Sequence, residues 1–128
     1  MLALDELVSA EAGRATARLT LTDRMLFVRD GRLDTVITLE YMAQTVAACL
    51  GLEALAEGGT VRVGMVVACR TMTIHRPELA VGEVLHCEVE RVRGTPDVSL
   101  FTGLTRDESG AVVAEVSLTL VHGEAPPA

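Results

Sequence analysis

The chain has 128 residues, of which 49% are hydrophobic, 23% charged and 2% aromatic, and its formal net charge is −7. This length suits one domain, and the apolar fraction excludes an intrinsically disordered chain. All eleven basic residues are Arg, scattered through an acidic sequence, so neither a nucleic-acid-binding surface nor one for anionic membranes is expected.

Two strands are expected at the start of the chain, Leu2–Ala10 and Arg14–Thr22, joined by a turn at Gly13. In the second strand small or apolar residues alternate with polar ones, which is typical of a strand with one buried face. The following segment, Asp23–Leu33, shows no regular period and is expected to be irregular.

A single long helix is expected next. Either Asp34 or Thr35 can cap its start, and it runs to about Glu57, where Gly58 and Gly59 end it. Because the helix is apolar on nearly every side, we expect it to be enclosed by other elements.

The rest of the chain has the period of two that indicates strands, at Val61–His75, Gly82–Arg93, Val98–Arg106 and Ala111–His122. One buried helix wrapped by an antiparallel sheet of about six strands is the hotdog architecture, of class α+β, and a different α+β roll is the alternative. We expect a single domain over residues 1–122 and a flexible tail over 123–128.

The helix carries one polar pair of interest. Glu40 and Gln44 lie about 40° apart on one face, which they share with the small or apolar residues Val36, Ala43, Ala47 and Gly51. A carboxylate in such a stripe should lose solvation, which favours its protonated form and suits it to proton transfer. Alternatively, Glu40 caps a neighbouring loop, or this face meets solvent at the edge of a dimer.

The histidines and cysteines are scattered and show no metal-binding spacing, so no metal site is expected. Thiols without a CxxC motif suggest a reducing, cytoplasmic location. The N-terminus has no cationic start, so no signal peptide is expected. The apolar stretch Val36–Leu55 is interrupted by Glu40, Gln44 and Glu53, which argues against a membrane span.

The segment Glu40–Gln44 resembles the E-x-M-A-Q signature of 3-hydroxyacyl-acyl carrier protein dehydratases, which have the hotdog fold. Thr73–Leu85 is similar to their F-R-x-P-V-x-P-G-D-x-L motif, and Met1–Asp5 to the end of their P-H-R-x-P-M-L-L-L-D opening. The resemblance is strongest to the small dehydratase-like proteins of aryl polyene and related lipid clusters, whose G-x-x-x-x-x-R run matches Gly64–Arg70. It covers nearly the whole chain.

This resemblance implies loss of water from a 3-hydroxyacyl thioester on an acyl carrier protein, giving the trans-2-enoyl thioester in fatty acid or polyene biosynthesis without a metal or organic cofactor. It implies active sites at the interface of a homodimer or of two related subunits. Glu40 would assist departure of the 3-hydroxyl group, supported by Gln44, while a histidine removes the proton next to the carbonyl. Backbone N–H groups would polarise that carbonyl, here those of Thr35, Val36, Ile37 and Thr38.

The catalytic histidine of the better-known dehydratases has no counterpart, because Val28–Leu39 contains no His. Three explanations are open: the natural chain starts further upstream, a partner subunit supplies the base, or His75 acts across the interface. The chain could also be a degenerate subunit that pairs with an active paralogue, or a thioesterase in which Glu40 activates water. Because an acyl carrier protein is acidic, Arg70 and Arg76 are candidates for docking it.

Overall fold

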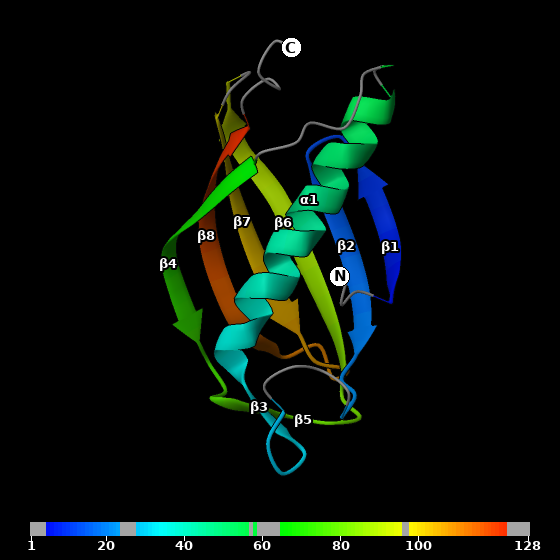
Figure 1. Ribbon diagram of the computed structural model, residues 1–128, viewed down its shortest axis with the longest axis vertical. Coiled ribbons are helices and arrows are strands. Elements are labelled where there is room, and N and C mark those ends of the chain that lie inside the picture. The colour runs from blue at the N-terminus through cyan, green and yellow to red at the C-terminus, as the bar shows by residue number, and fades with distance from the viewer. Residues whose placement is uncertain (1–4, 24–27, 57, 59–64, 96–97, 123–128) are drawn as a thin grey trace.

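The computed structural model describes residues 5–23, 28–56, 58, 65–95 and 98–122. Six antiparallel strands form one sheet in the order β1-β2-β6-β7-β8-β4, and two short strands, β3 and β5, form another. A short 3₁₀ turn, Thr35–Ile37, leads into the one α-helix of the described residues, α1, which crosses one face of the large sheet (Figure 1). The elements are β1 Glu6–Glu11, β2 Arg14–Thr20, β3 Arg32–Asp34, α1 Thr38–Ala56, β4 Met65–Ile74, β5 Glu78–Ala80, β6 Val84–Gly94, β7 Val98–Arg106 and β8 Val112–His122.

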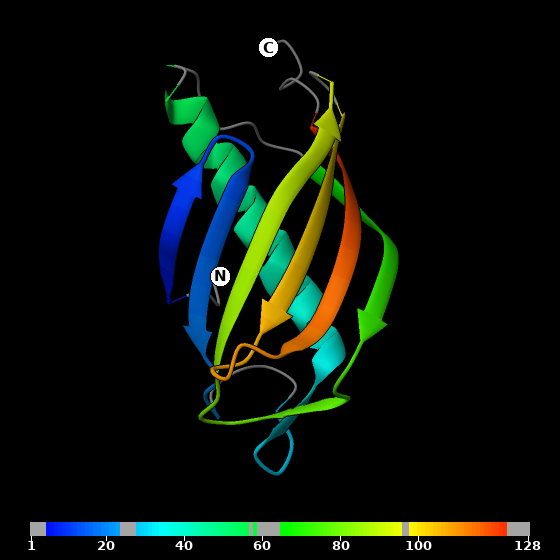
Figure 2. The same ribbon diagram turned by 180° about the vertical axis from the view of Figure 1, so that it is seen from behind.

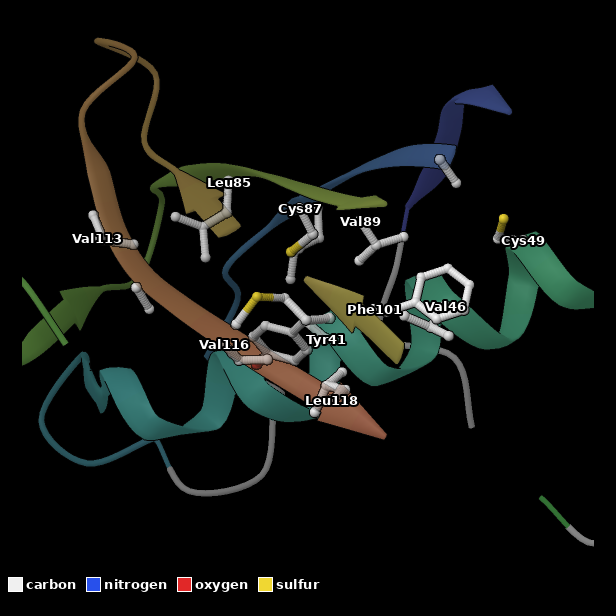
Figure 3. Packing of buried hydrophobic residues seen from close by; sticks show 14 of the residues in the cluster. Tyr41, Val46, Cys49, Leu85, Cys87, Val89, Phe101, Val113, Val116 and Leu118 are labelled. Carbon is white, nitrogen blue, oxygen red and sulfur yellow. The ribbon is translucent and has the colours of Figure 1, made fainter. Parts of the chain in front are cut away.

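The core lies between α1 and the concave face of the sheet (Figure 3). From the helix, Tyr41, Met42 and Val46 are buried against side chains of four strands. These include Leu19 of β2, Leu85 and Val89 of β6, Phe101 of β7, and Val116 and Leu118 of β8. One face of each strand therefore packs on the helix, and the alternate residues form the outer face of the sheet, seen in Figure 2.

The hotdog architecture expected from the sequence is confirmed. The six predicted strands appear in the large sheet, and Gly13 has the positive φ, 75°, that its turn requires. The small β3–β5 sheet was not predicted, because each of its strands has only three residues and shows no period. The expected tail, the opening motif before residue 5 and Gly59 lie outside the described residues.

The expectation that α1 is enclosed on every side is wrong for a single chain. Val36, just before α1, is 50% exposed, and Leu52 and Leu55, in the C-terminal half of α1, are 43% and 60% exposed. By length and composition alone, Thr35–Leu55 could cross a bilayer. Its sheet-facing residues, however, form the core of the domain, as in the central helix of a globular protein.

A partly buried ion pair holds the C-terminal half of α1 to the sheet. The guanidinium of Arg91, in β6, donates to both carboxylate oxygens of Glu53 at 2.7 and 3.2 Å. The backbone N–H of Gly13 donates to the same carboxylate at 2.6 Å. The Arg91 guanidinium also lies 5.2 Å from the centre of the Phe101 ring. This group, here called the Glu53 clamp, joins α1, the β1–β2 turn and β6.

Candidate active site

The start of α1 is anchored to the connection between β4 and β5. The backbone N–H of Thr35 donates to the Pro77 carbonyl at 2.9 Å, and the Thr35 hydroxyl donates to the carbonyl of Arg76. The Thr38 hydroxyl donates to the Thr35 carbonyl at 2.8 Å. Both threonines are fully buried, so the backbone that precedes Glu40 is held in one position.

The N–H groups predicted to polarise a thioester carbonyl, those of Thr35–Thr38, are largely used within the chain. The first donates to Pro77, the N–H of Val36 donates to the Asp34 carboxylate at 2.9 Å, and that of Thr38 reaches two carbonyls of the preceding turn. A substrate oxygen would have to share these donors, and the Asp34 carboxylate offsets the positive end of the helix dipole. Their catalytic role stays a prediction.

Glu40 and Gln44 share one face of α1, as predicted. The Gln44 side-chain amide donates to a Glu40 carboxylate oxygen at 3.3 Å. The expectation that Glu40 loses its solvation is wrong for the single chain, because Glu40 is exposed. The reason is the orientation of the helix, which turns the neighbouring Tyr41 and Met42 into the core and Glu40 away from the sheet.

His75 does not meet Glu40 within one chain. Its Nε2 lies 2.7 Å from a carboxylate oxygen of Glu115, in β8. Glu115 alternates with the buried Ala114 and Val116, so this pair lies on the outer face of the sheet, opposite α1. The other histidine with a described side chain, His86, is the cross-strand partner of Arg18 and Arg106 on the same outer face. Neither of these two histidines lies on the side of the sheet that carries Glu40.

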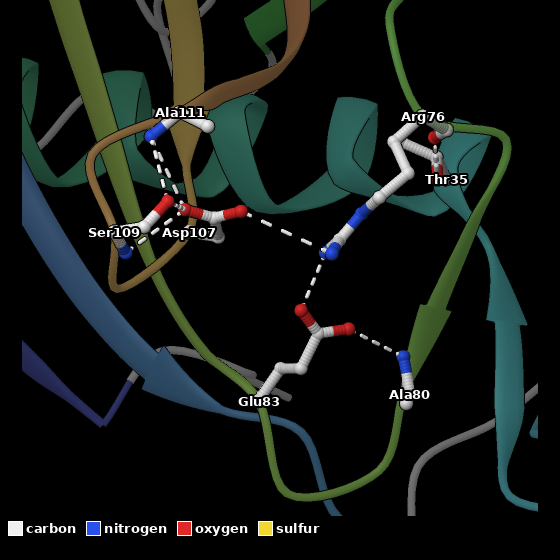
Figure 4. A network of polar contacts seen from close by, with 7 residues as sticks. All are labelled: Thr35, Arg76, Ala80, Glu83, Asp107, Ser109 and Ala111. Carbon is white, nitrogen blue, oxygen red and sulfur yellow. Dashed lines mark hydrogen bonds and ion pairs between the residues drawn. The ribbon is translucent and has the colours of Figure 1, made fainter.

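The two arginines predicted to dock a carrier protein differ in their surroundings. Arg70 is exposed, whereas the Arg76 guanidinium pairs with Glu83 and lies 3.9 Å from a carboxylate oxygen of Asp107 (Figure 4). This engagement does not favour the docking role of Arg76. The Arg76 side chain instead links the β4–β5 connection to the turn between β7 and β8. The sequence patterns do not predict this link.

Asp107 organises that turn. Its carboxylate accepts from the Ser109 hydroxyl at 2.6 Å and from the N–H groups of Ser109 and Ala111 at 2.9 and 3.1 Å. The hydrogen bond from the Ser109 hydroxyl is the largest of the causes that lower the pKa of Asp107 below its ordinary value of 3.8, and the charge of Arg76 acts in the same direction.

We expect Ser109→Ala to destabilise the protein at neutral pH and to have little effect in acid. Because the pKa of Asp107 is lower in the folded state than in the unfolded state, its contribution is present above pH 3.8 and is lost as the pH falls through the folded pKa. Urea unfolding midpoints of wild type and variant at several pH values measure this. Ser117→Ala, which removes a hydroxyl from the outer face of the sheet, serves as the control; a pH-independent loss in Ser109→Ala would contradict the assignment.

The described residues contain no group of three His, Cys, Asp or Glu side chains placed to hold a metal ion. What they offer is one carboxyl with an amide beside it, on an apolar helix face that the chain itself leaves uncovered. Such a group can give or take one proton, and a second proton-transfer group has to come from elsewhere.

Comparison with known proteins agrees with this architecture. The family described as ApeP dehydratase (ApeP-like) matches residues 1–126. Among solved structures, the dehydratase heterocomplex ApeI:P from Xenorhabdus doucetiae matches with a TM-score of 0.87 and 16% identity, over 95% of this chain and 83% of that chain. No curated protein sequence matches the chain.

More distant structures share the fold. A putative esterase from Mycobacterium tuberculosis matches with a TM-score of 0.74 and 18% identity, over 98% of this chain and 95% of that one. The PaaI protein of the E. coli phenylacetic acid degradation operon matches with a TM-score of 0.73 and 15% identity, over 94% and 80% of the two chains. At such identities the likeness concerns the fold, which carries several chemistries.

Proposed function

The chain belongs to the ApeP-like dehydratase family, and from this premise we propose that it takes part in removing water from a 3-hydroxyacyl thioester carried by an acyl carrier protein. We propose that it works as one subunit of a hotdog assembly. In that assembly it contributes Glu40, and the partner subunit contributes the base.

The position of Glu40 carries this proposal. The carboxyl lies on an uncovered helix face, and both histidines with described side chains lie on the opposite side of the sheet. Among the described side chains no histidine faces Glu40, so in our proposal the base comes from a second chain seated on that face. Such a chain would also cover the exposed Val36, which shares that face.

The reaction needs two proton transfers. The partner's base removes the proton from the carbon next to the thioester carbonyl, and protonated Glu40 gives its proton to the hydroxyl group on the next carbon. The C–O bond breaks, a carbon–carbon double bond forms, and water leaves. Gln44, by donating to one oxygen of Glu40, orients the carboxyl so that the other oxygen faces the substrate.

Mass spectrometry of a 3-hydroxyacyl-loaded carrier protein tests the proposal, with this chain alone, a histidine-bearing hotdog partner alone, and the two combined. Loss of one water from the combination, but not from this chain alone, is the expected result. Loss of the whole acyl group would identify a thioesterase instead.

A second function is favoured by the same separation of Glu40 from the histidines: a non-catalytic subunit that supports an active paralogue. Mixing the histidine-bearing partner with the Glu40→Gln variant of this chain distinguishes the catalytic subunit from the non-catalytic one. Undiminished loss of water there would assign the catalysis to the partner alone.

We propose that the partner pairs along β4, which is an edge strand of the sheet and hydrogen-bonds to β8 on one side. An open edge strand presents unpaired backbone groups that a second chain can satisfy. Cys69 of β4 is exposed and lies opposite Leu118, on the α1 side of the sheet.

We expect alkylation of the isolated folded chain to modify Cys69 rapidly and Cys49 and Cys87 only on unfolding. The latter two thiols are buried, and burial raises the pKa of Cys87 to about 11, which suppresses the reactive thiolate. In the assembled complex Cys69 should become protected. Peptide mass spectrometry after timed alkylation measures this, and equal labelling of Cys69 in both forms would exclude β4 as the interface.

A further inference from the structure

A pocket of about 490 Å³ lies on the outer face of the sheet, the face away from α1. Four neighbouring strands contribute to it: β4 gives Arg70, β8 gives Thr119, β7 gives Val98 and Leu100, and β6 gives Arg93 and Gly94. The pocket is separate from Glu40, which lies beyond the helix on the opposite side.

The lining residues form a row across the sheet. Thr119 is opposite Leu100, and Leu100 is opposite Arg93. Arg70 is the extra residue where the β4–β8 register shifts between Cys69 and Thr71. Neighbouring strands lie about 4.8 Å apart, and three strand intervals separate β4 from β6. The backbone positions of the two arginines are therefore roughly 14 Å apart. Long side chains from both ends of the row thus line one pocket.

This pair differs from most arginines in the chain. Of the nine arginines in the described residues, three have side chains without an ion pair, Arg29, Arg70 and Arg93, and two of these three share the pocket. The six others pair with carboxylates: Arg14, Arg18, Arg32, Arg76, Arg91 and Arg106.

Among the described residues, the lack of a counter-charge is local. On the same outer face, nearer the β7–β8 turn, Glu90 pairs with Arg14, Glu88 with Arg106 and Glu115 with His75. At the level of the pocket, the cross-strand neighbours are Thr119 and Leu100, which carry no charge. Two guanidinium groups that line one pocket repel each other, and an anion that bridges them removes that repulsion.

We propose that Arg70 and Arg93 form a binding site for a phosphate group. The planar guanidinium fork matches phosphate oxygens through paired hydrogen bonds, and the Thr119 hydroxyl adds a third donor. Inorganic phosphate and the phosphates of coenzyme A present the same chemistry. This inference goes beyond the proposed function, because the pocket and Glu40 lie on opposite sides of the sheet.

Isothermal titration of the full chain at low ionic strength, where screening is weak, tests the site with inorganic phosphate, coenzyme A and pantetheine. Phosphate and coenzyme A should bind, whereas pantetheine, which carries no phosphate, should not. Tighter binding of coenzyme A than of inorganic phosphate would identify a coenzyme A-like ligand as the source of the phosphate group, and equal binding would identify free phosphate.

Arg70→Ala and Arg93→Ala should each weaken phosphate binding by about tenfold or more, the effect of losing one charge-assisted contact. Arg29→Ala, which removes the third unpaired arginine, should bind as wild type, and Arg70→Lys should recover only part of the affinity. Circular dichroism checks that each variant folds.

Wild type that binds no phosphate, or Arg70→Ala and Arg93→Ala that bind it unchanged, would overturn the proposal. The Glu40→Gln variant should bind phosphate as the wild type does. Loss of dehydration activity and loss of phosphate binding can therefore be told apart.

Discussion

Glu40→Gln should lower the rate of water loss by the assembled complex by about 10² to 10⁴-fold, the usual contribution of one general acid. Glutamine has nearly the same shape as glutamate but has no carboxyl proton to give to the departing hydroxyl group. Single-turnover conversion of a 3-hydroxyacyl carrier protein, followed by mass spectrometry, measures the effect.

The substitution should leave the fold intact, because Glu40 is exposed and its described contact, the amide of Gln44, remains possible with a glutamine. Glu108→Gln, at an exposed position in the β7–β8 turn, is the matched control and should be as active as wild type. If Glu40→Gln retains full activity while the complex stays assembled, the carboxyl has no part in the chemistry.

Phe101→Ala should lower the free energy of unfolding by about 3–5 kcal/mol, the range for removing a fully buried aromatic ring. Phe101 has no exposed surface, lies in the middle of the core and is in contact with the Arg91 guanidinium of the Glu53 clamp. The ring therefore supports the packing of α1 on the sheet and the position of the ion pair at once. Chemical denaturation with a two-state fit measures the loss.

Phe101→Leu, which keeps most of the apolar volume, should cost much less, about 1 kcal/mol. Combining Phe101→Leu with Arg91→Ala in a double-mutant cycle isolates the contact between ring and guanidinium, for which we expect about 0.5–1 kcal/mol. An Ala variant no less stable than the Leu variant would show that the core closes around the missing ring.

Local patterns were sufficient to predict the large sheet and the helix. The alternation in β2 places Ala15, Ala17 and Leu19 in the core, as the structure confirms, because one buried face imposes a period of two. The small β3–β5 sheet escaped prediction since its register depends on contacts between Arg32–Asp34 and Glu78–Ala80, far apart in the sequence.

The site was less accessible to sequence reasoning. The helical period places Glu40 and Gln44 on one face, but nothing in that period says whether the face meets the sheet or solvent. The pairing of Arg76 with Glu83 and Asp107, and the gathering of Arg70 with Arg93, depend on tertiary structure. The residue pattern of one helix or strand predicts which of its own side chains lie next to one another. The carboxylates that pair with an arginine come from other elements, which that pattern does not describe.

The order of elements along the chain has a consequence for biosynthesis. A ribosome completes α1 at residue 56, but β6, β7 and β8, which supply most of the cover for its apolar residues, emerge only after residue 84. Until then the first hairpin, β1–β2, is the main cover for the nascent helix, and β2 lacks β6, its neighbour in the sheet. Exposed apolar segments of this kind favour aggregation and chaperone binding. Even after folding, the outer side of α1 stays exposed in the single chain, so the yield of this subunit in a cell should rise when a partner subunit is made with it.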